Sequence, residues 1–323
     1  MITFIYITCR KNPKLEWFVD SLCNQKDDTP IQLVIVDYDL QFDETRRELF
    51  SKIVRNRLDF VHVSSKPNPV QGKYRLTSIN YFSAGSARNT GICYAKYDYL
   101  VFIDDTSIMK EGSFSEILKC ANEKIIVSFG YKKVRAMVIE DGKFISGRFD
   151  EHGTDSRWNQ GLEFRKISGS QLFGYSASPL SVILSVNGYD EICNTMGGED
   201  YHYGVRVEKL NIPIYYNRNV TFYESEDFAN QAGCLFLRRD PVFNKEKYEA
   251  MMVIYNVSKR WVEDGAYDLT HLILDMLLRD KSWTEGNNYN LAELRDKIQK
   301  GGEFESKFDP DMKSVEGLYL RDL

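Results

Sequence analysis

The sequence has few of the features that membrane, disulfide-rich or zinc-binding proteins need. Its six cysteines are scattered over 323 residues without a CxxC pair, which argues against a zinc site or a disulfide scaffold. We therefore expect reduced cysteines that serve in packing. No apolar run is long enough to cross a membrane, and the opening MITFIYIT is too short for a signal-peptide core. These absences predict a cytoplasmic protein with no transmembrane segment.

Basic charge and nucleotide-loop motifs are also scarce. The formal net charge is -5, and phosphate backbones call for a clustered basic surface, so no nucleic-acid partner is expected. No GxGxxG follows the first predicted strand, and GxxxxGK[ST] does not occur. The sequence therefore argues against a dinucleotide-binding dehydrogenase and against a P-loop enzyme.

Apolar runs of strand length alternate with helical patterns through the first hundred residues. The predicted strands are ITFIYIT, IQLVIVDYD, DFVHVSS and DYLVFIDDTS. Continuous apolar strands separated by amphipathic helices predict the α/β class, with a mostly parallel sheet covered on both faces. In the helix predicted over 43–56, Leu49, Ile53 and Val54 are expected to point inward. Small residues in 83–97, among them Gly91, would let that helix lie close to the sheet.

Beyond residue 110 the alternation weakens. Asp141-Gly142 predicts a tight turn in a hairpin over 134–149, and a further strand is expected over 211–225. From Pro241 onward two segments carry apolar helical stripes, and the last forty or so residues are polar and predict a loosely held tail. We expect a sheet domain over 1–225 and a helical carboxyl-terminal extension with a polar tail over 226–323.

Candidate site residues follow the predicted strands, because ligands of open parallel sheets bind beyond the carboxyl ends of the strands. Thr8 and Arg10 follow the first strand, Asp37 ends the second, and Asp104 and Asp105 end the fourth. Two adjacent carboxylates repel each other unless a cation lies between them, and Mg²⁺ or Mn²⁺ fits that need. The other interpretation is that the two aspartates cap a turn.

A second acidic pair, Glu199-Asp200, follows two glycines and precedes a helical pattern. One interpretation is a turn with an acidic helix start. The other is a catalytic pair, since adjacent residues at a helix start point in different directions.

Four ordered segments carry a family resemblance. They are ITFIYITCRKNPKLEWFVDSLCNQ, IQLVIVDYD, SAGSARNTGICYAKYDYLVFIDDTS and VNGYDEICNTMGGEDYHYGVRVEKLNIPIYY. In this order they resemble the nucleotide-sugar glycosyltransferases of the GT-A fold, which is Rossmann-like, and among them the inverting family 2 group. The NGYDE and GGED portion is similar to the carboxyl-terminal half of the galactosyltransferase and chondroitin-polymerase type. The resemblance covers about the first two-thirds of the chain.

The resemblance implies an inverting transfer of a hexose from a UDP-sugar to a hydroxyl of a glycan acceptor. Asp200 would be the general base that takes the acceptor proton as the hydroxyl attacks the anomeric carbon, opposite the departing diphosphate. Glu199 would orient the acceptor. The helix N-terminus is expected to keep Asp200 ionised at neutral pH.

The resemblance also implies a donor pocket. Asp37 would hold the uracil or ribose, and Arg88 would lie near the diphosphate. Thr8, Arg10 and Asp104 would lie beside it.

A divalent ion, Mn²⁺ or Mg²⁺, is implied at Asp104 and Asp105, which fall on the DxD motif. Thr106 replaces the last acid of that motif, so either Asp105 binds the ion directly or Asp104 does so with Thr106 holding a coordinated water. Many relatives supply a metal-binding histidine that the stretch VTFYESED lacks. Either Glu224 or Glu226 would take its place, or the ion is held weakly or is dispensable.

Three other functions remain open at this stage. A sugar-nucleotide pyrophosphorylase should open with a Gly-rich, Arg-containing phosphate loop, which ITCRKNPK does not resemble. A non-catalytic sugar-binding relative would keep the fold without turnover. A retaining transferase would use the same fold with the other stereochemistry.

Overall fold

The computed structural model describes residues 1–41, 43–66, 84–151, 154–189, 191, 199–228 and 289–304. The strands are β1 Ile2–Thr8, β2 Ile31–Asp37, β3 Asp59–Val63, β4 Tyr99–Asp104, β5 Ser107–Met109, β6 Ile126–Glu140, β7 Lys143–Phe149, β8 Phe164–Ile167, β9 Ser176–Pro179 and β10 Ile214–Ser225. The helices are α1 Leu15–Cys23, α2 Thr45–Val54, α3 Ala84–Tyr94, α4 Ser113–Glu123, α5 Leu180–Ser185, α6 Glu199–Lys209 and α12 Leu291–Gln299. Two 3-10 turns, Tyr38–Gln41 and Gly169–Gln171, complete the described elements.

The strands form one mixed sheet in the order β3-β2-β1-β4-β9-β6-β10-β5. Strands β3, β2, β1 and β4 pair in parallel, and so do β6 and β10. Along this path β9 and β5 run antiparallel to their neighbours. The α/β class and the mostly parallel sheet predicted from the sequence are therefore confirmed.

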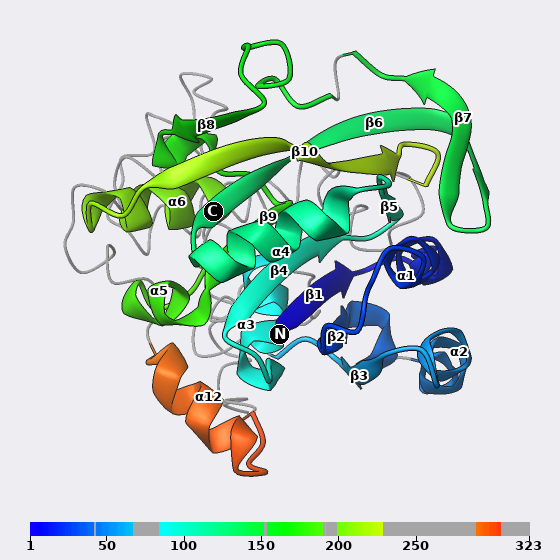
Figure 1. The fold of residues 1–323 in the computed structure, drawn as a ribbon. Coiled ribbons are helices and arrows are strands. Elements are labelled where there is room, and N and C mark those ends of the chain that lie inside the picture. Colours follow the sequence, from blue (N-terminus) through cyan, green and yellow to red (C-terminus); the bar gives the residue numbers. More distant parts are fainter. Residues whose placement is uncertain are drawn as a thin grey trace, which may run out of the picture.

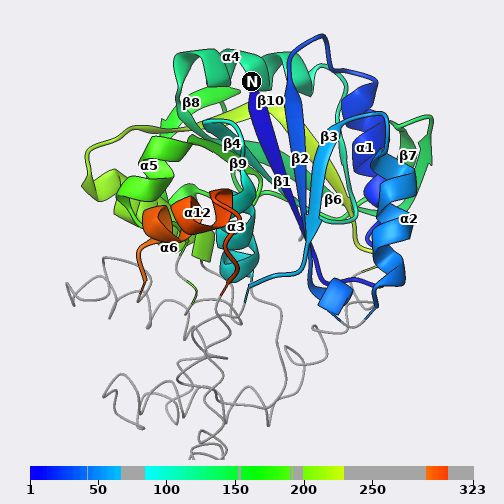
Figure 2. The ribbon, with the colours of Figure 1, turned by 90° about the horizontal axis from the view of Figure 1, so that it is seen from below.

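Helices cover both faces of the sheet, with α1, α2 and α4 on one side and α3, α5, α6 and α12 on the other (Figures 1 and 2). Alternate side chains of β1 enter opposite cores: Phe4 packs with Phe18 of α1, whereas Ile5 packs with Ile92 of α3. The central strands are therefore apolar throughout because both of their faces are buried.

Gly91 sets how closely α3 approaches β1. A β-carbon at Gly91 would lie 2.3 Å from Cγ2 of Ile5. This contact confirms that small residues bring the helix close to the sheet, and it fixes the height of α3 above the strand ends.

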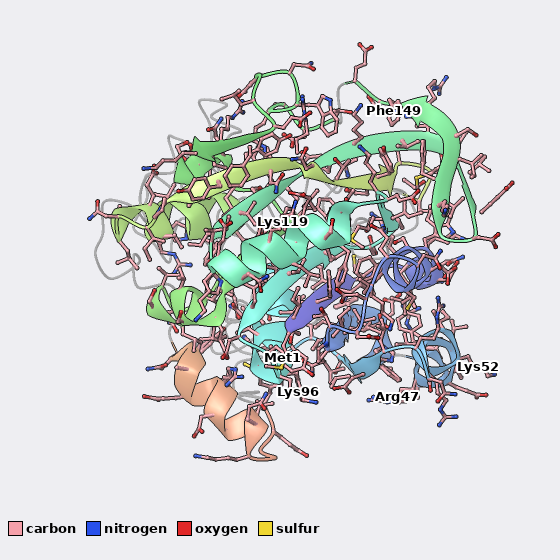
Figure 3. The ribbon with its side chains drawn as sticks, in the orientation of Figure 1. Met1, Arg47, Lys52, Lys96, Lys119 and Phe149 are labelled. Carbon is pink, nitrogen blue, oxygen red and sulfur yellow. The ribbon has the colours of Figure 1, made fainter. Side chains whose placement is uncertain are left out.

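The buried face of α2 differs from the predicted one. Arg46, Phe50 and Val54 are buried, whereas Leu49 is 50% exposed. The prediction that Leu49 points inward is wrong, because Arg46 turns toward a buried carboxylate on β2 and rotates the helix accordingly. Charged side chains such as Lys52 on α2 and Lys119 on α4 lie on the outer sides of their helices (Figure 3).

The hairpin of β6 and β7 turns at Asp141-Gly142, as predicted. Both residues have positive φ, 47° and 70°, which suits a tight hairpin turn. Phe149, at the end of β7, lies at the margin of the molecule (Figure 3).

Part of the carboxyl-terminal segment is docked on the domain. The predicted helices between 241 and 280 lie outside the described residues. Helix α12 begins after Asn290, whose side chain accepts hydrogen bonds from the amides of Ala292 and Glu293 at 2.9 and 3.2 Å. Leu291 is fully buried in the core on the α3 side. The prediction of a loosely held tail is wrong for this stretch, because apolar side chains fix it to the sheet domain.

The cysteines only partly follow the sequence prediction. Cys23, Cys93 and Cys120 are free thiols. Cys9 is in a disulfide, so the expectation of reduced cysteines throughout is wrong there. No helix within the described ranges is long and apolar enough to cross a membrane.

Candidate active site

The carboxyl ends of three neighbouring strands meet at one edge of the sheet. Thr8 of β1 lies opposite Asp37 of β2, and Ile7 lies opposite Asp104 of β4. The parallel pairing therefore gathers the polar residues that follow these strands, as the position of ligand sites in such sheets predicts.

Asp105 is held by two of the other predicted site residues. It accepts hydrogen bonds from Thr8 Oγ1 at 2.6 Å and from Arg10 Nε at 2.8 Å. Burial raises the pKa of Asp105 to about 6, against the opposing influence of Arg10 and Thr8. Both of its oxygens thus have a donor inside the protein.

Thr106 turns the chain sharply after the acidic pair. It is fully buried with a φ of 54°, which is rare for a β-branched residue. Its amide donates to Pro13 O at 2.9 Å, and its carbonyl accepts from the Ser225 amide at 3.0 Å. These bonds hold the strained turn and let Asp104 and Asp105 face different partners.

Arg88 of α3 joins the end of β4 to the start of α6. Its Nη2 donates to Asp104 Oδ1 at 3.0 Å, and its Nη1 donates to Glu199 Oε1. Its guanidinium carbon lies 5.3 Å from the centroid of the Tyr189 ring. Burial by itself would lower the pKa of Arg88, but Asp104 and Glu199 raise it above its usual value. The side chain is therefore a permanent cation between two predicted functional acids.

Asp200 lies beside Glu199 in the first turn of α6. It is half-buried and accepts a hydrogen bond from the Tyr201 amide at 2.8 Å, while Glu199 Oε2 is buried without a hydrogen-bond partner. Burial, and then the charge of Glu199, raise the pKa of Asp200 to about 7, against the effect of Arg88. The expectation that the helix N-terminus keeps Asp200 fully ionised at neutral pH is therefore met only in part, because burial and the adjacent carboxylate oppose the helix dipole.

Gly174 lies against the Asp104–Arg88 pair. A β-carbon there would lie 2.7 Å from Asp104 Oδ2 and 2.9 Å from Arg88 Nη2. The loop before β9 therefore approaches the pair as closely as backbone permits.

Asp37 is placed away from solvent. Its oxygens accept hydrogen bonds from Arg46 at 2.6 and 2.9 Å, and His62 Nε2 lies 3.2 Å away. Arg46 also donates to the carbonyls of Arg10 and Lys11, at 2.9 and 2.8 Å. In this arrangement Asp37 shapes the loop after β1, and its contact with a base or ribose stays a prediction.

Glu224 of β10 lies opposite Lys133 of β6 in the parallel pairing. One carboxylate oxygen contacts the Lys133 ammonium, and the other accepts a hydrogen bond from Tyr175 at 3.0 Å. Each oxygen of Glu224 therefore already has a partner within the protein.

The three predicted metal ligands do not form an open ligand set. Arg88 takes an oxygen of Asp104, Arg10 takes Asp105, and Lys133 takes Glu224. In the described part of the chain, no group of three or more histidine, cysteine, aspartate or glutamate side chains is arranged to hold a metal ion. Asp104 keeps one oxygen, Oδ2, outside its contact with Arg88, whereas Arg10 and Thr8 hold Asp105, and Lys133 and Tyr175 hold Glu224. One open carboxylate oxygen is a poor ligand set for a divalent ion, so the residues as placed do not fit it.

Sequence reasoning missed Lys133, Tyr175 and Arg46. Lys133 had a detectable signal, because a lysine pair interrupts the otherwise apolar strand around 126–134. Arg46 had none, since a charged residue on an amphipathic helix is normally solvated.

Neither a family model nor a curated protein sequence matches this chain. Solved structures of residues 1–349 of S. aureus TarS do match. The UDP complex gives a TM-score of 0.51 at 12% identity, covering 94% of this chain and 93% of that chain. The UDP-GlcNAc complex gives 0.51 at 15% identity, covering 79% and 65%. A third TarS structure gives 0.50 at 15% identity, and there the match spans 64% of that chain.

A weaker match is GalNAc-T7 solved with UDP, GalNAc and Mn²⁺, with a TM-score of 0.48 at 12% identity over 84% of this chain and 57% of that chain. The TarS matches and the sheet topology together define a GT-A-like glycosyltransferase fold. The predicted GT-A-like fold of the sheet domain is thereby confirmed, whereas most of the predicted helical extension lies outside the described residues.

Proposed function

We propose that this protein is an inverting glycosyltransferase that moves a hexose from a UDP-sugar to a carbohydrate hydroxyl. The observation that carries the proposal is the Arg88 bridge, which brings the β4 carboxylate Asp104 to the acidic start of α6. In a GT-A-like sheet the donor lies at the strand ends, so this bridge sets the acids of α6 beside the place where the donor is cleaved. The complexes of TarS with UDP-GlcNAc and UDP support a uridine nucleotide as the donor carrier.

Asp200 acts as the general base. An acceptor hydroxyl gives its proton to the Asp200 carboxylate while its oxygen forms a bond to the anomeric carbon. The bond from that carbon to the diphosphate breaks on the opposite face, and the diphosphate leaves with the electron pair. A carboxylate with a pKa of about 7 is well matched to this task, because it is a stronger base than an ordinary aspartate and is still half ionised at neutral pH.

Glu199 and Arg88 position the reacting groups. Glu199 Oε2 accepts a hydrogen bond from a second hydroxyl of the acceptor. This bond gives a partner to a buried oxygen that otherwise lacks one. Arg88 holds Glu199 and Asp104 at a fixed separation, so that acceptor and donor approach in one geometry.

The donor side is formed by the loop after β1 and the end of β4. Arg10 and Thr8 hold Asp105, which leaves the partly exposed Asp104 to face the donor beside Gly174. Asp37 acts through Arg46, which fixes the backbone of Arg10.

The test is turnover of a panel of nucleotide sugars, followed by product-anomer analysis by NMR. Asp200→Asn should lower kcat by about 10²- to 10⁴-fold and leave donor affinity unchanged, because the amide keeps the shape and loses the base. Asp59→Asn is the matched control, since that side chain is 52% exposed on β3. Equal turnover by the Asp200→Asn variant would refute the general-base role, and a retained anomeric configuration would refute inversion.

A further inference from the structure

Lys133 lies among the acidic side chains Glu224, Glu226 and Asp104 at the end of β4. It lies in the middle of β6, its side chain is 24% exposed, and its ammonium contacts Glu224 and lies 3.4 Å from Glu226 Oε1. A lysine at this depth in an apolar strand needs partners, and its partners are the carboxylates of Glu224 in β10 and of Glu226, just after that strand. The side chain of Lys133 is therefore only partly covered by the protein.

The sheet register brings Lys133 to the end of β4. Glu224 is paired with Lys133 on one side and with Ser107 of β5 on the other, and Ser107 follows Asp105 by two residues. Burial by itself would lower the pKa of Lys133, but Glu224, Glu226 and Asp104 raise it above its usual value. The register and the influence of Asp104 both place the ammonium beside the end of β4.

Three protein cations contact the acids around the end of β4. Asp104 pairs with Arg88, Asp105 with Arg10 and Glu224 with Lys133. Arg88 is shared between Asp104 and Glu199, and Lys133 is shared between Glu224 and Glu226. An incoming diphosphate therefore meets fixed cations among the carboxylates. Of the three cations, Arg88 and Arg10 are both more buried than Lys133, and the flexible lysine stem gives Lys133 the greatest freedom to turn toward a phosphate.

We infer that the Lys133 ammonium binds the donor diphosphate and stabilises its charge as it leaves, in the place where the resemblance implies a divalent ion. This inference rests on the proposed function. It makes donor binding and cleavage independent of Mn²⁺ and Mg²⁺.

The first experiment measures UDP binding by calorimetry in the presence of EDTA. Lys133→Met should bind UDP about 10- to 100-fold more weakly than the wild type, which is the expected loss of one charge-assisted contact. Lys133→Arg should retain binding. Lys132→Met is the matched control, because the neighbouring lysine faces the other side of β6, 4.3 Å from the Trp158 ring centroid. Lys133→Met leaves the buried Glu224 carboxylate without its cation and could destabilise the fold. The double variant Lys133→Met/Glu224→Gln removes that unpaired charge, so weak UDP binding by this variant reports the loss of the lysine and not misfolding.

The second experiment measures Mn²⁺ directly by electron paramagnetic resonance, with and without UDP. The wild type should hold no Mn²⁺ at the site and should turn over equally in EDTA and in Mn²⁺. In Lys133→Met the Glu224 carboxylate no longer contacts the lysine ammonium and can bind a metal ion. This variant should therefore gain Mn²⁺ binding and recover part of its turnover when Mn²⁺ is added.

The outcomes are distinguishable. Unchanged UDP affinity in Lys133→Met would overturn the assignment of Lys133 to the diphosphate. Turnover or UDP binding by the wild type that requires Mn²⁺ would overturn it as well. UDP binding that depends on Lys133, without transfer of any sugar, would overturn the transferase proposal and leave the assignment standing. A folded wild type that binds no UDP would overturn both.

Discussion

At the scale of single residues, the adjacent acids Glu199 and Asp200 at the start of α6 have different neighbours. Glu199 is paired with a buried arginine, whereas Asp200 is half-buried beside that negative charge. The two neighbouring carboxylates therefore lie in different electrostatic environments, and burial and the adjacent Glu199 raise the pKa of Asp200.

This difference predicts the pH dependence of the proposed reaction. Asp200 must be deprotonated to accept a proton, and its pKa is raised to about 7. We expect kcat/KM to rise with pH by about tenfold per pH unit up to pH 7 and then to level off. Glu199→Gln should move this acid limb to lower pH, because it removes the negative charge that helps raise the pKa of Asp200.

The measurement is a pH–rate profile of both proteins with donor below KM. The Asp59→Asn variant changes an exposed side chain of β3 and should keep the acid limb of the pH–rate profile at the wild-type pH. An acid limb that does not move in Glu199→Gln would contradict the electrostatic coupling, even if the variant is slower.

At the scale of elements, the height of α3 above β1 positions Arg88. Gly91 lies three residues after Arg88 on the same helix, against Ile5. We expect Gly91→Ala to destabilise the fold by about 1–3 kcal/mol, because the added methyl group overpacks this contact. The measurement is urea unfolding monitored by circular dichroism.

The control for Gly91→Ala is the background Ile5→Ala, which removes the colliding atoms. In that background the same change should cost less, or become favourable by up to about 1 kcal/mol, since alanine is the better helix former. Equal costs in the two backgrounds would show that the close approach of α3 to β1 is not the cause.

At the scale of the whole molecule, the chain end returns to support the site from behind. Asn89, next to Arg88, donates to Glu191 at 2.9 Å and to the Tyr289 hydroxyl at 3.1 Å, and Tyr289 donates to Glu191 at 2.5 Å. Leu291 of α12 packs beside Gly188. The segment around α12 therefore braces the helix that carries Arg88.

Loss of the contacts made by α12 should lower the stability of the whole domain. We expect Leu291→Ala to lower the free energy of unfolding by about 2–5 kcal/mol, because it empties a fully buried position. Leu210→Ala, at a leucine that is 47% exposed, should change it by less than about 0.5 kcal/mol. Calorimetric melting of both variants makes the comparison, and an unchanged melting temperature for Leu291→Ala would mean that α12 is not held to the domain.

The sequence by itself determined the alternation of strands and helices, the sheet class, the hairpin turn and the strand ends at which polar residues gather. These follow from periodicity and turn chemistry, which are local properties of the chain. It also singled out Asp104, Asp105, Glu199 and Asp200 as candidates, because acids beside glycines or at strand ends stand out from their surroundings.

Only the tertiary structure decided which partners these acids have. Arg46 turns inward to Asp37, Lys133 meets Glu224 across two strands, and Arg88 joins β4 to α6. Each pairing joins residues from separate elements, and the energy of a buried charge depends on its neighbours in space. The pKa of Asp200 is likewise set by burial and by Glu199 and Arg88, so the dipole of its own helix was insufficient to predict it.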